Sequence, residues 1–385
     1  MKIAYISASG IPSRTANSIH VMKMCQAMTQ EGHAATLIGL HVDSAETNFW
    51  HHYGIETPFP LHRLKLRPAL RGHDFYLRAL WLARSADLIF TRHVAAALWS
   101  ARFGKPTFLE LHHLPSKPKT IAYLRQIAGA RGLCGLVVIS ESLKQALLEQ
   151  FTWLTAEQIF VLPDGVDLAR FANLPKPSQA RQQRKLSEQF TVGYAGHLYP
   201  GRGIGLILEA AQQLPQCHFL MMGGHPQDVE KRRVQSAEMG VSNVTFTGFI
   251  ANATLPDYLS ACDILLMPYQ QNVSISSAAK GQAVNTANWM SPMKMFEYMA
   301  MRRTIITSDL PVLREVLNES NALFCPPDNA AAWTNAIRQA ATNPDQCYQL
   351  AQQAAADVTQ YSWRVRTQKI IQLSQHRVKL AIRNA

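Results

Sequence analysis

The sequence lacks the features that would place this protein inside a membrane or outside the cell. No apolar run approaches the roughly 18–20 residues that a membrane-spanning helix needs. Residues 1–7 have a short strand pattern, without the longer apolar stretch and small-residue cleavage site of a signal peptide. The six cysteines are scattered, with no Cys-x-x-Cys pair, and most sit in apolar segments. We therefore expect a cytoplasmic protein with buried, reduced thiols, and neither a disulfide framework nor a zinc site.

Two familiar phosphate-binding signatures are also missing. The chain contains no Gly-x-x-x-x-Gly-Lys-Ser/Thr loop. Its glycine-rich stretch at residues 193–205 lacks the Gly-x-Gly-x-x-Gly spacing, and no clear acidic partner for a ribose follows about 20 residues later. These absences argue against a P-loop protein and against the usual dinucleotide-binding fingerprint.

Acidic residues are scarce, and the excess of positive charge is uneven. The chain has 38 Lys and Arg against 26 Asp and Glu, a formal net charge of +12. Between residues 60 and 131 there are thirteen Lys or Arg and only three acids, which are Asp74, Asp87 and Glu110. Such a region attracts nucleic acid, anionic lipid or an acidic substrate, although a generally basic solvated surface is also consistent with it. Nucleic acid is disfavoured, because no recognition-helix, RNP-like or zinc-finger pattern accompanies the charge.

The 385 residues predict two or more domains. Short apolar strands alternate with longer helical patterns, and the alternation restarts after a polar segment rich in Pro and Gln. Near-continuous apolar strands are typical of a parallel sheet covered on both faces, so we predict two α/β domains in tandem. The expected divisions are a first domain at 1–173, a linker at 174–190, a second domain at 191–360 and a final helix at 361–385. Ligands of such sheets bind beyond the carboxyl ends of the strands, or in a cleft between domains.

The segment from Ser291 to Ala300 is a candidate phosphate site. Ser291 is a good N-cap and Pro292 suits the first helical position. A helix N-terminus offers unpaired N–H groups and partial positive charge to an anion. Lys294 and Glu297 are three apart and share a helix face, which suits the diphosphate and the ribose hydroxyls of a nucleotide. A capped surface helix with a charge pair is equally consistent with the same residues.

Two further strand ends carry candidate side chains. Arg202 follows a predicted strand in a glycine-rich turn, where it could bind a phosphate at the start of the next helix, or the turn could be only a tight connection. In the first domain, an apolar strand ends at Glu110, followed by His112 and His113. A histidine pair at a strand end is a candidate for ligand contact. A metal site is disfavoured there, because no other ligand cluster stands at a suitable spacing.

Several motifs together resemble the retaining, nucleotide-sugar-dependent glycosyltransferases of the GT-B fold, glycosyltransferase family 4. The matching segments run in order through the second half of the chain, at residues 162–171, 193–203, 243–249, 259–269, 291–300 and 307–316. The match in the first half is thinner, at residues 1–39 and the Glu110–His112 strand end. The resemblance implies two Rossmann-like, doubly wound parallel-sheet domains with an interdomain cleft, and a last helix that packs back on the first domain.

The resemblance also implies roles at the matching positions. Glu297 would bind the ribose, Arg202 and Lys294 would hold the diphosphate, and His112 would contact the sugar. Gly248 and Phe249 would lie near the base, and other donor contacts would come from Gly196, His197, Ser291 and Met293. No divalent metal and no cofactor besides the UDP- or GDP-sugar donor is expected, since the cations and the helix N-terminus can neutralise a leaving diphosphate.

The chain departs from the family pattern at several positions. Trp289 stands where a first glutamate is usual, His197 replaces an arginine, and residues 302–304 replace a Gly-x-Pro. The first glycine-rich loop is replaced by residues 13–18, so we expect Arg14 to approach the phosphates or the acceptor.

The expected reaction is transfer of a sugar from a nucleoside-diphosphate sugar to a glycan or lipid-linked hydroxyl, with retention of configuration. No candidate carboxylate nucleophile emerges, so front-face attack within an ion-pair-like complex is expected. The basic first domain favours peripheral association with an anionic membrane surface. Two rival interpretations stay open: a nucleotide-sugar epimerase on the same architecture, and a non-catalytic or partner-dependent binding subunit.

Overall fold

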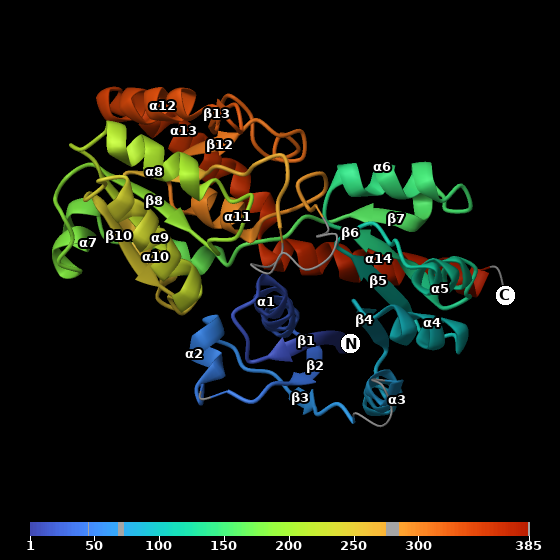
Figure 1. Ribbon diagram of the computed structural model, residues 1–385. Helices are drawn as coiled ribbons and strands as arrows, with labels where there is room; N and C mark the ends of the chain where they lie inside the picture. The colour runs from blue at the N-terminus through green and yellow to red at the C-terminus, as the bar shows by residue number, and fades with distance from the viewer. Residues whose placement is uncertain (45, 68–72, 275–284, 384–385) are drawn as a thin grey trace. The chain divides into compact units, whose positions relative to one another are not determined.

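The protein folds into two compact units, as the computed structural model shows (Figure 1). The structure describes residues 1–44, 46–67, 73–274 and 285–383; Arg71, one of the basic residues counted above, lies outside these ranges. The first unit comprises Met1–Gly165 and Trp363–Ala385, and the second comprises Val166–Ser362. Among the described residues, no helix combines the length and apolar character needed to cross a bilayer.

The first unit is built on a seven-stranded parallel sheet with the order β3-β2-β1-β4-β5-β6-β7. Three interior strands illustrate why the sequence forms such a sheet. Every residue of β4 and β5 is buried, and so is every residue of β6 except the first. Strands buried in this way are typical of a parallel sheet that helices cover on both faces. The elements are β1 (Lys2–Ile11), α1 (Ala16–Gln30), β2 (Ala34–His41), α2 (Phe49–Tyr53), β3 (Leu61–Leu64), α3 (His73–Leu82), β4 (Leu88–Thr91), α4 (Val94–Arg102), β5 (Thr107–Leu111), α5 (Pro118–Ala128), β6 (Leu133–Val138), α6 (Glu141–Gln150), β7 (Ile159–Val161) and α14 (Trp363–Arg383).

The second unit is built on a six-stranded parallel sheet with the order β10-β9-β8-β11-β12-β13. The strands β8, β9, β11 and β12 are completely buried. The elements are α7 (Pro177–Gln183), β8 (Thr191–Ala195), α8 (Ile204–Gln213), β9 (His218–Met222), α9 (Pro226–Glu238), β10 (Val244–Gly248), α10 (Leu255–Ser260), β11 (Ile264–Met267), α11 (Met293–Ala300), β12 (Thr304–Ser308), β13 (Leu323–Cys325), α12 (Ala330–Thr342) and α13 (Pro344–Asp357). The prediction of two parallel-sheet domains is therefore confirmed.

The strand order of the second unit fixes where a ligand is expected. From β8 the chain runs outward to β9 and β10 on one side, and from β11 to β12 and β13 on the other. The order therefore reverses between the neighbours β8 and β11. In open parallel sheets the crevice beyond the carboxyl ends of the strands at such a switch point is the usual ligand site.

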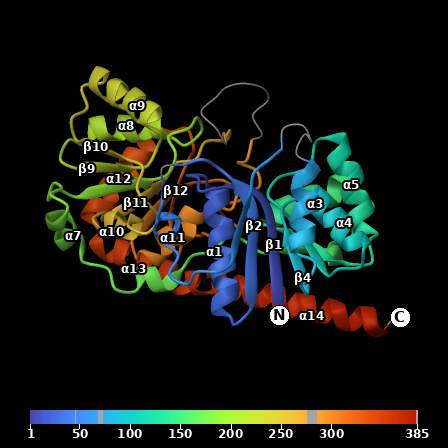
Figure 2. The same ribbon diagram turned by 90° about the horizontal axis from the view of Figure 1, so that it is seen from below.

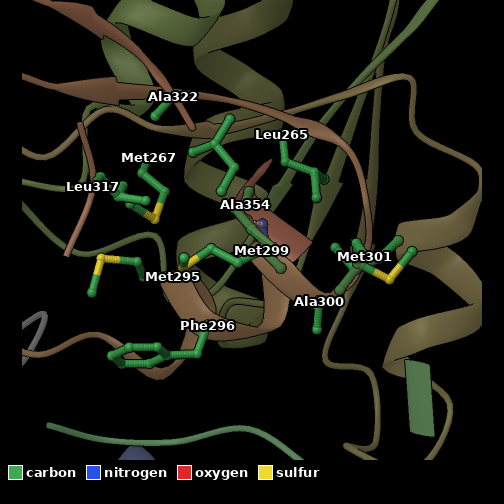
Figure 3. Close-up of a cluster of buried hydrophobic side chains, with 14 of the residues drawn as sticks. Leu265, Met267, Met295, Phe296, Met299, Ala300, Met301, Leu317, Ala322 and Ala354 are labelled. Carbon is green, nitrogen blue, oxygen red and sulfur yellow. Dashed lines mark hydrogen bonds between the residues drawn. The ribbon is translucent and has the colours of Figure 1, made fainter. Parts of the chain in front are cut away.

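Helix α11 is held against this sheet by an apolar face. Met295, Phe296 and Met299 are all buried, and Figure 3 shows them within the hydrophobic cluster that also contains Leu265 and Met267 of β11. Lys294, which precedes Met295, and Glu297, which follows Phe296, are only half-buried. The core-facing methionines and phenylalanine thus fix the direction in which the Lys294 and Glu297 side chains leave the helix.

The predicted linker differs from the structure. Residues 174–190 contain helix α7, and its Arg181 is 8% exposed and forms a 2.9 Å ion pair with Asp263 of the second unit. Arg184 forms a second 2.9 Å ion pair with Asp257. The polar composition that predicted a linker therefore belongs to a helix whose cations are paired with acids about 80 residues away. The unit boundary lies earlier, between Gly165 and Val166.

The long C-terminal helix α14 is part of the first unit. It packs beside α1, as Figure 2 shows, and Arg364 forms a 2.6 Å ion pair with Glu31 at the end of α1. Arg366 is 4% exposed and its guanidinium donates to the carbonyl oxygens of Leu162 and Pro163. The first unit is thus closed by a segment that follows the second unit in the chain.

Candidate functional site

Helix α11 begins one residue later than predicted. Pro292 occupies the N-cap position, and its carbonyl accepts a hydrogen bond from Met295 N–H, so Ser291 precedes the cap and Met293 is the first helical residue. Tyr298, one turn beyond Lys294, accepts a 2.7 Å hydrogen bond from the backbone N–H of Ala195, the last residue of β8. This bond ties the helix to the carboxyl end of β8, beside the switch point.

Two cations meet above two aromatic rings at this place. The Lys294 Nζ lies 3.9 Å from the ring centroid of Tyr194 and 5.3 Å from that of Tyr269. The Arg202 Cζ lies 5.1 Å from the Tyr269 centroid. Neither cation forms an ion pair with a carboxylate among the residues that the structure describes, and the Arg202 Nε is buried without a hydrogen-bond partner there. Such a pair of cations, held by ring faces and not by acids, is a site for an anion.

The pKa of Lys294 also indicates an anion-binding site. Burial lowers the pKa of Lys294 well below 10.5, the nearby Arg202 cation lowers it further, and Glu297 acts in the opposite direction. A bound diphosphate would reverse the repulsion between the two cations and favour the charged ammonium. Both cations therefore favour an anion at this place.

Glycines allow the backbone to pass close to these cations. A Cβ on Gly196 would lie 2.9 Å from the Lys294 Nζ, and Gly196 has a φ of +140°. Gly203, the N-cap of α8, has a φ of +71°, and a Cβ there would lie 1.9 Å from the backbone oxygen of Pro268. The turn that presents Arg202 thus depends on glycine, as its composition predicted.

The other predicted donor residues lie along the same sheet edge or near it. Gly196 follows β8 and donates from its N–H to Met222 O at the end of β9, while Gly248 O at the end of β10 accepts from Gly223 N–H. The His197 ring stacks on Tyr199, with centroids 4.4 Å apart, and Phe249 is half-buried just after β10. Strand pairing thus brings Gly196 and Gly248 to one edge.

The first unit contains a second, buried polar cluster around Glu110 at the end of β5. Its Oε2 accepts from the Tyr5 hydroxyl at 2.7 Å and lies 3.2 Å from His20 Nε2. Its Oε1 accepts from Arg366 Nη2 at 2.5 Å and lies 3.2 Å from His112 Nε2. Residues from β1, α1, β5 and α14 therefore converge on one carboxylate.

The pKa values of the two histidines in this cluster are shifted in opposite directions. Burial opposes charge on His20, but the carboxylates of Glu110 and Asp164, the latter 2.9 Å from Nδ1, raise its pKa overall. Burial and the Arg92 cation lower the pKa of His112 to about 4. His20 thus keeps its proton to a higher pH than a free imidazole, whereas His112 is a neutral imidazole near neutral pH, able to exchange hydrogen bonds with a hydroxyl.

The cluster has a spacing that a metal ion could span. One ligand atom each of His20, Glu110 and His112 lies within 4.8 Å of the others. The Glu110 oxygens, however, already accept from the Arg366 guanidinium and the Tyr5 hydroxyl, which a cation would have to displace. The donor set fits an ion-pair network better than a metal centre.

Sequence reasoning missed several members of both clusters. Tyr194 and Tyr269 contact the two cations, Tyr298 ties α11 to β8, and His20 with Arg366 completes the Glu110 network. A usable signal existed only for Tyr269, which follows the strand β11 by two residues. Arg14 lies on the exposed loop before α1, and His113 is also exposed.

Comparison with known proteins gives matches over most of the chain. Residues 18–170 match a family model described as Glycosyltransferase Family 4, and residues 189–343 match one described as Glycosyl transferases group 1. TuaH of Bacillus subtilis strain 168, named as a putative teichuronic acid biosynthesis glycosyltransferase, is 29% identical over 157 residues, 40% of this chain and 35% of that protein.

A second curated relative covers more of the chain. The GDP-mannose-dependent alpha-(1-6)-phosphatidylinositol monomannoside mannosyltransferase of Mycobacterium tuberculosis is 24% identical over 217 residues, 55% of this chain and 54% of that protein. The chain thus spans between about a third and about half of the length of these curated relatives.

Solved structures show the same fold over nearly the whole chain. Anabaena Alr3699/HepE, in complex with UDP, superposes with a TM-score of 0.74 at 19% identity, covering 97% of this chain and 99% of that one. A glycosyltransferase from Rickettsia africae superposes with a TM-score of 0.75 at 15% identity, covering 98% and 99%. The predicted GT-B architecture of two Rossmann-like units agrees with both.

Proposed function

We propose that this chain, which belongs to the glycosyltransferases of family 4 and group 1, transfers a sugar from a nucleoside-diphosphate sugar to a hydroxyl acceptor with retention of configuration. The observation that carries the proposal is the pair of cations, Arg202 and Lys294, at the switch point of the second sheet without carboxylate partners among the described residues. A diphosphate supplies the negative charge that this arrangement needs.

Each residue of the second-unit cluster then has a role that follows from its chemistry. Arg202 and Lys294 bind the diphosphate and neutralise the charge that grows on it as the glycosidic bond breaks. The N–H groups at the start of α11, beginning with Met293, add donors to the same phosphates. Glu297 accepts hydrogen bonds from the two ribose hydroxyls, and Gly196 and Gly248 leave room for the donor. These positive groups and N–H donors support a transfer reaction that needs no divalent metal.

The proposed retention of configuration depends on the arrangement of His112, the acceptor hydroxyl and the leaving diphosphate around the sugar. We assign His112 to the transferred sugar, where its neutral imidazole exchanges hydrogen bonds with a sugar hydroxyl. The acceptor hydroxyl attacks the anomeric carbon from the face that the diphosphate leaves. The acceptor proton passes to an oxygen of the departing phosphate, which makes a separate carboxylate nucleophile unnecessary.

Relatives support the donor class and indicate the type of acceptor. The Anabaena protein has been solved with UDP and glucose, whereas the Mycobacterium enzyme is named as GDP-mannose-dependent. The proposed donor is therefore a UDP- or GDP-sugar. The relatives' names mention teichuronic acid and a phosphatidylinositol mannoside, which supports a glycan or lipid-linked acceptor. With the basic residues at 60–131, this favours work at an anionic membrane surface.

The test is thermal stabilisation by a panel of UDP- and GDP-sugars. Saturating donor that binds only the folded protein stabilises it by about 2.7 kcal/mol at 100 times Kd. We expect stabilisation by one nucleotide class, lost in Glu297→Ala and kept in Glu238→Ala, which removes an exposed acid from α9. No shift with any donor would refute the donor site. Stabilisation without turnover would favour a binding subunit instead, and conversion of the donor without an acceptor would favour an epimerase.

A further inference from the structure

Large exposed apolar side chains are concentrated on two neighbouring helices of the first unit. Leu77 and Trp81 of α3 are 57% and 63% exposed, and Trp99 and Phe103 at the end of α4 are 36% and 72% exposed. Each pair is four residues apart, so its members stack along one helix face. Helices α3 and α4 pack side by side, as Figure 2 shows, so the two faces adjoin.

A groove of 460 Å³ is lined by Leu77, Trp99 and Phe103 from this set. Its walls include Leu77 and Leu80 of α3 and Trp99 and Phe103 from α4, and Arg84 and Lys105 also line it. The rings of Trp99 and Phe103 are stacked with centroids 6.0 Å apart. We call these exposed apolar residues and this groove the α3–α4 surface.

Cations surround the α3–α4 surface. The Arg84 Cζ lies 4.3 Å from the Trp81 ring centroid, and the Arg102 Cζ lies 5.8 Å from that of Trp99. Lys105 also lines the groove, where its ammonium donates to the carbonyl oxygens of Arg84 and Ala86, and Arg131 lies against Gly104. Guanidinium groups over exposed indole rings, with further cations at the edge, combine an apolar centre with a positive rim.

The nearby acids do not neutralise this rim. Asp74 is 5% exposed and lies 3.3 Å from Arg78 on its own helix. Asp87 accepts a 2.7 Å hydrogen bond from the backbone N–H of Lys2. The α3–α4 surface therefore presents apolar and positive groups together, with its two local acids directed into other contacts.

We infer that the α3–α4 surface binds an anionic lipid bilayer, with Leu77, Trp81, Trp99 and Phe103 entering the boundary between headgroups and acyl chains. Tryptophan and phenylalanine with Arg and Lys beside them are the composition of an interfacial membrane contact. The groove takes an acyl chain, while Arg84 and Arg102 contact lipid phosphates.

Charge decides between a bilayer and a second copy of the chain. Two copies meeting through this surface with twofold symmetry would bring the same cations face to face, and juxtaposed like charges disfavour such a contact. An anionic membrane offers both the apolar layer and the opposite charge. The inference deepens the proposed function, because it rests on the proposal that the chain works at a membrane surface, but it does not depend on the transfer chemistry.

Sedimentation of the full chain with vesicles tests the inference. Vesicles of equal parts phosphatidylcholine and phosphatidylglycerol should bind the protein at low salt, and phosphatidylcholine alone should bind it weakly. Phe103→Ser should weaken binding about tenfold, because a phenylalanine side chain no longer enters the apolar layer. Arg84→Gln and Arg102→Gln should each weaken it about fivefold. The matched controls, Tyr348→Ser and Arg338→Gln, remove an exposed ring and an exposed cation from the second unit and should leave binding unchanged.

A second readout locates the contact. Acyl chains brominated near the headgroup should quench tryptophan fluorescence, and Trp81→Phe should remove part of that quenching while the thermal midpoint stays unchanged. Absence of vesicle binding, or equal loss in the Tyr348 and Phe103 variants, would overturn the inference. So would a dimer in sedimentation analysis that Phe103→Ser dissociates, since a second copy would then cover the surface. Nucleotide-induced stabilisation, measured without vesicles, separates failure of this inference from failure of the proposed transfer reaction.

Discussion

Replacing Lys294 with methionine should separate nucleotide binding from folding. Methionine keeps most of the length of the side chain and removes its charge. In the ligand-free protein Lys294 contacts the Tyr194 ring and is near the repelling Arg202, with no ion pair among the described residues. Loss of the cation–π contact, about 0.5–1 kcal/mol, is offset by relief of desolvation and repulsion. The ligand-free melting temperature should therefore change little.

The effect on the donor complex should be large. A hydrogen bond to a charged group contributes about 1.5–3 kcal/mol, so the nucleotide affinity should fall roughly 10- to 150-fold. The second unit, Val166–Ser362, falls in the size class in which 1 kcal/mol shifts the melting temperature by about 2–4 °C. The stabilisation by a saturating UDP- or GDP-sugar should shrink by about 3–12 °C in Lys294→Met.

The pH dependence of folding stability tests the contribution of the Lys294 charge to the ligand-free protein. The pKa of Lys294 is lowered in the folded protein, so the unfolded chain binds its proton more tightly. The resulting destabilisation is fully present below the folded pKa and is relieved as pH rises towards 10.5, the unfolded value. The free energy of unfolding of Lys294→Met, relative to that of the wild type, should therefore be highest at low pH. Differential scanning fluorimetry with and without donor measures both effects. An undiminished donor shift in Lys294→Met would refute the assignment of this cation to the diphosphate.

Three other changes test the supporting structure. Gly203→Ala should destabilise the second unit by at least about 2 kcal/mol in urea unfolding, because its Cβ would meet a backbone oxygen at 1.9 Å. The control Gly240→Ala, also at positive φ but with no atom within 4 Å of its Cβ, should cost about 1 kcal/mol. Equal losses of stability in the two variants would contradict the steric argument. Arg366→Met should cost about 3–5 kcal/mol, because the buried Glu110 carboxylate loses its guanidinium partner, and it should speed hydrogen exchange in α14; slow exchange there would count against the network. His20 has a raised pKa, so its stabilisation should be complete below pH 6.5 and decline as pH rises through the folded value; His20→Gln should abolish that decline in thermal melts, and a decline that persists would assign it to another group.

Local patterns in the sequence were sufficient to predict both sheets and the helix that carries Lys294. Strands such as β5 and β8 are buried throughout, and in an α/β chain a short, nearly continuous apolar run is typical of an interior parallel strand. The i,i+3 spacing of Lys294 and Glu297 correctly places them on the same side of α11, because the intervening residues must enter the core. The predicted cap was wrong by one residue, which is the usual uncertainty of a helix end.

Long-range pairing accounts for what could not be predicted. Tyr194 and Tyr269 flank Lys294 only because β8 and β11 are neighbours in the sheet. His20 reaches Asp164 across 144 residues, and Arg366 reaches Glu110 across 256. Helix α7 was taken for a linker because the acids that pair with its arginines are also remote in sequence. Sheet order brings the two tyrosines to Lys294, and the packing of helices against segments remote in sequence creates the other contacts.

The most direct test of the central claim is the anomeric configuration of the sugar that the enzyme releases. Nuclear magnetic resonance can follow an α-linked UDP- or GDP-sugar incubated with the protein and a simple alcohol as acceptor, because the glycoside that forms does not equilibrate between anomers. The proposal predicts appearance of the α product together with free nucleoside diphosphate, at a rate that Arg202→Ala lowers by at least about tenfold. Release of the β product, or no nucleoside diphosphate from any donor, would contradict it.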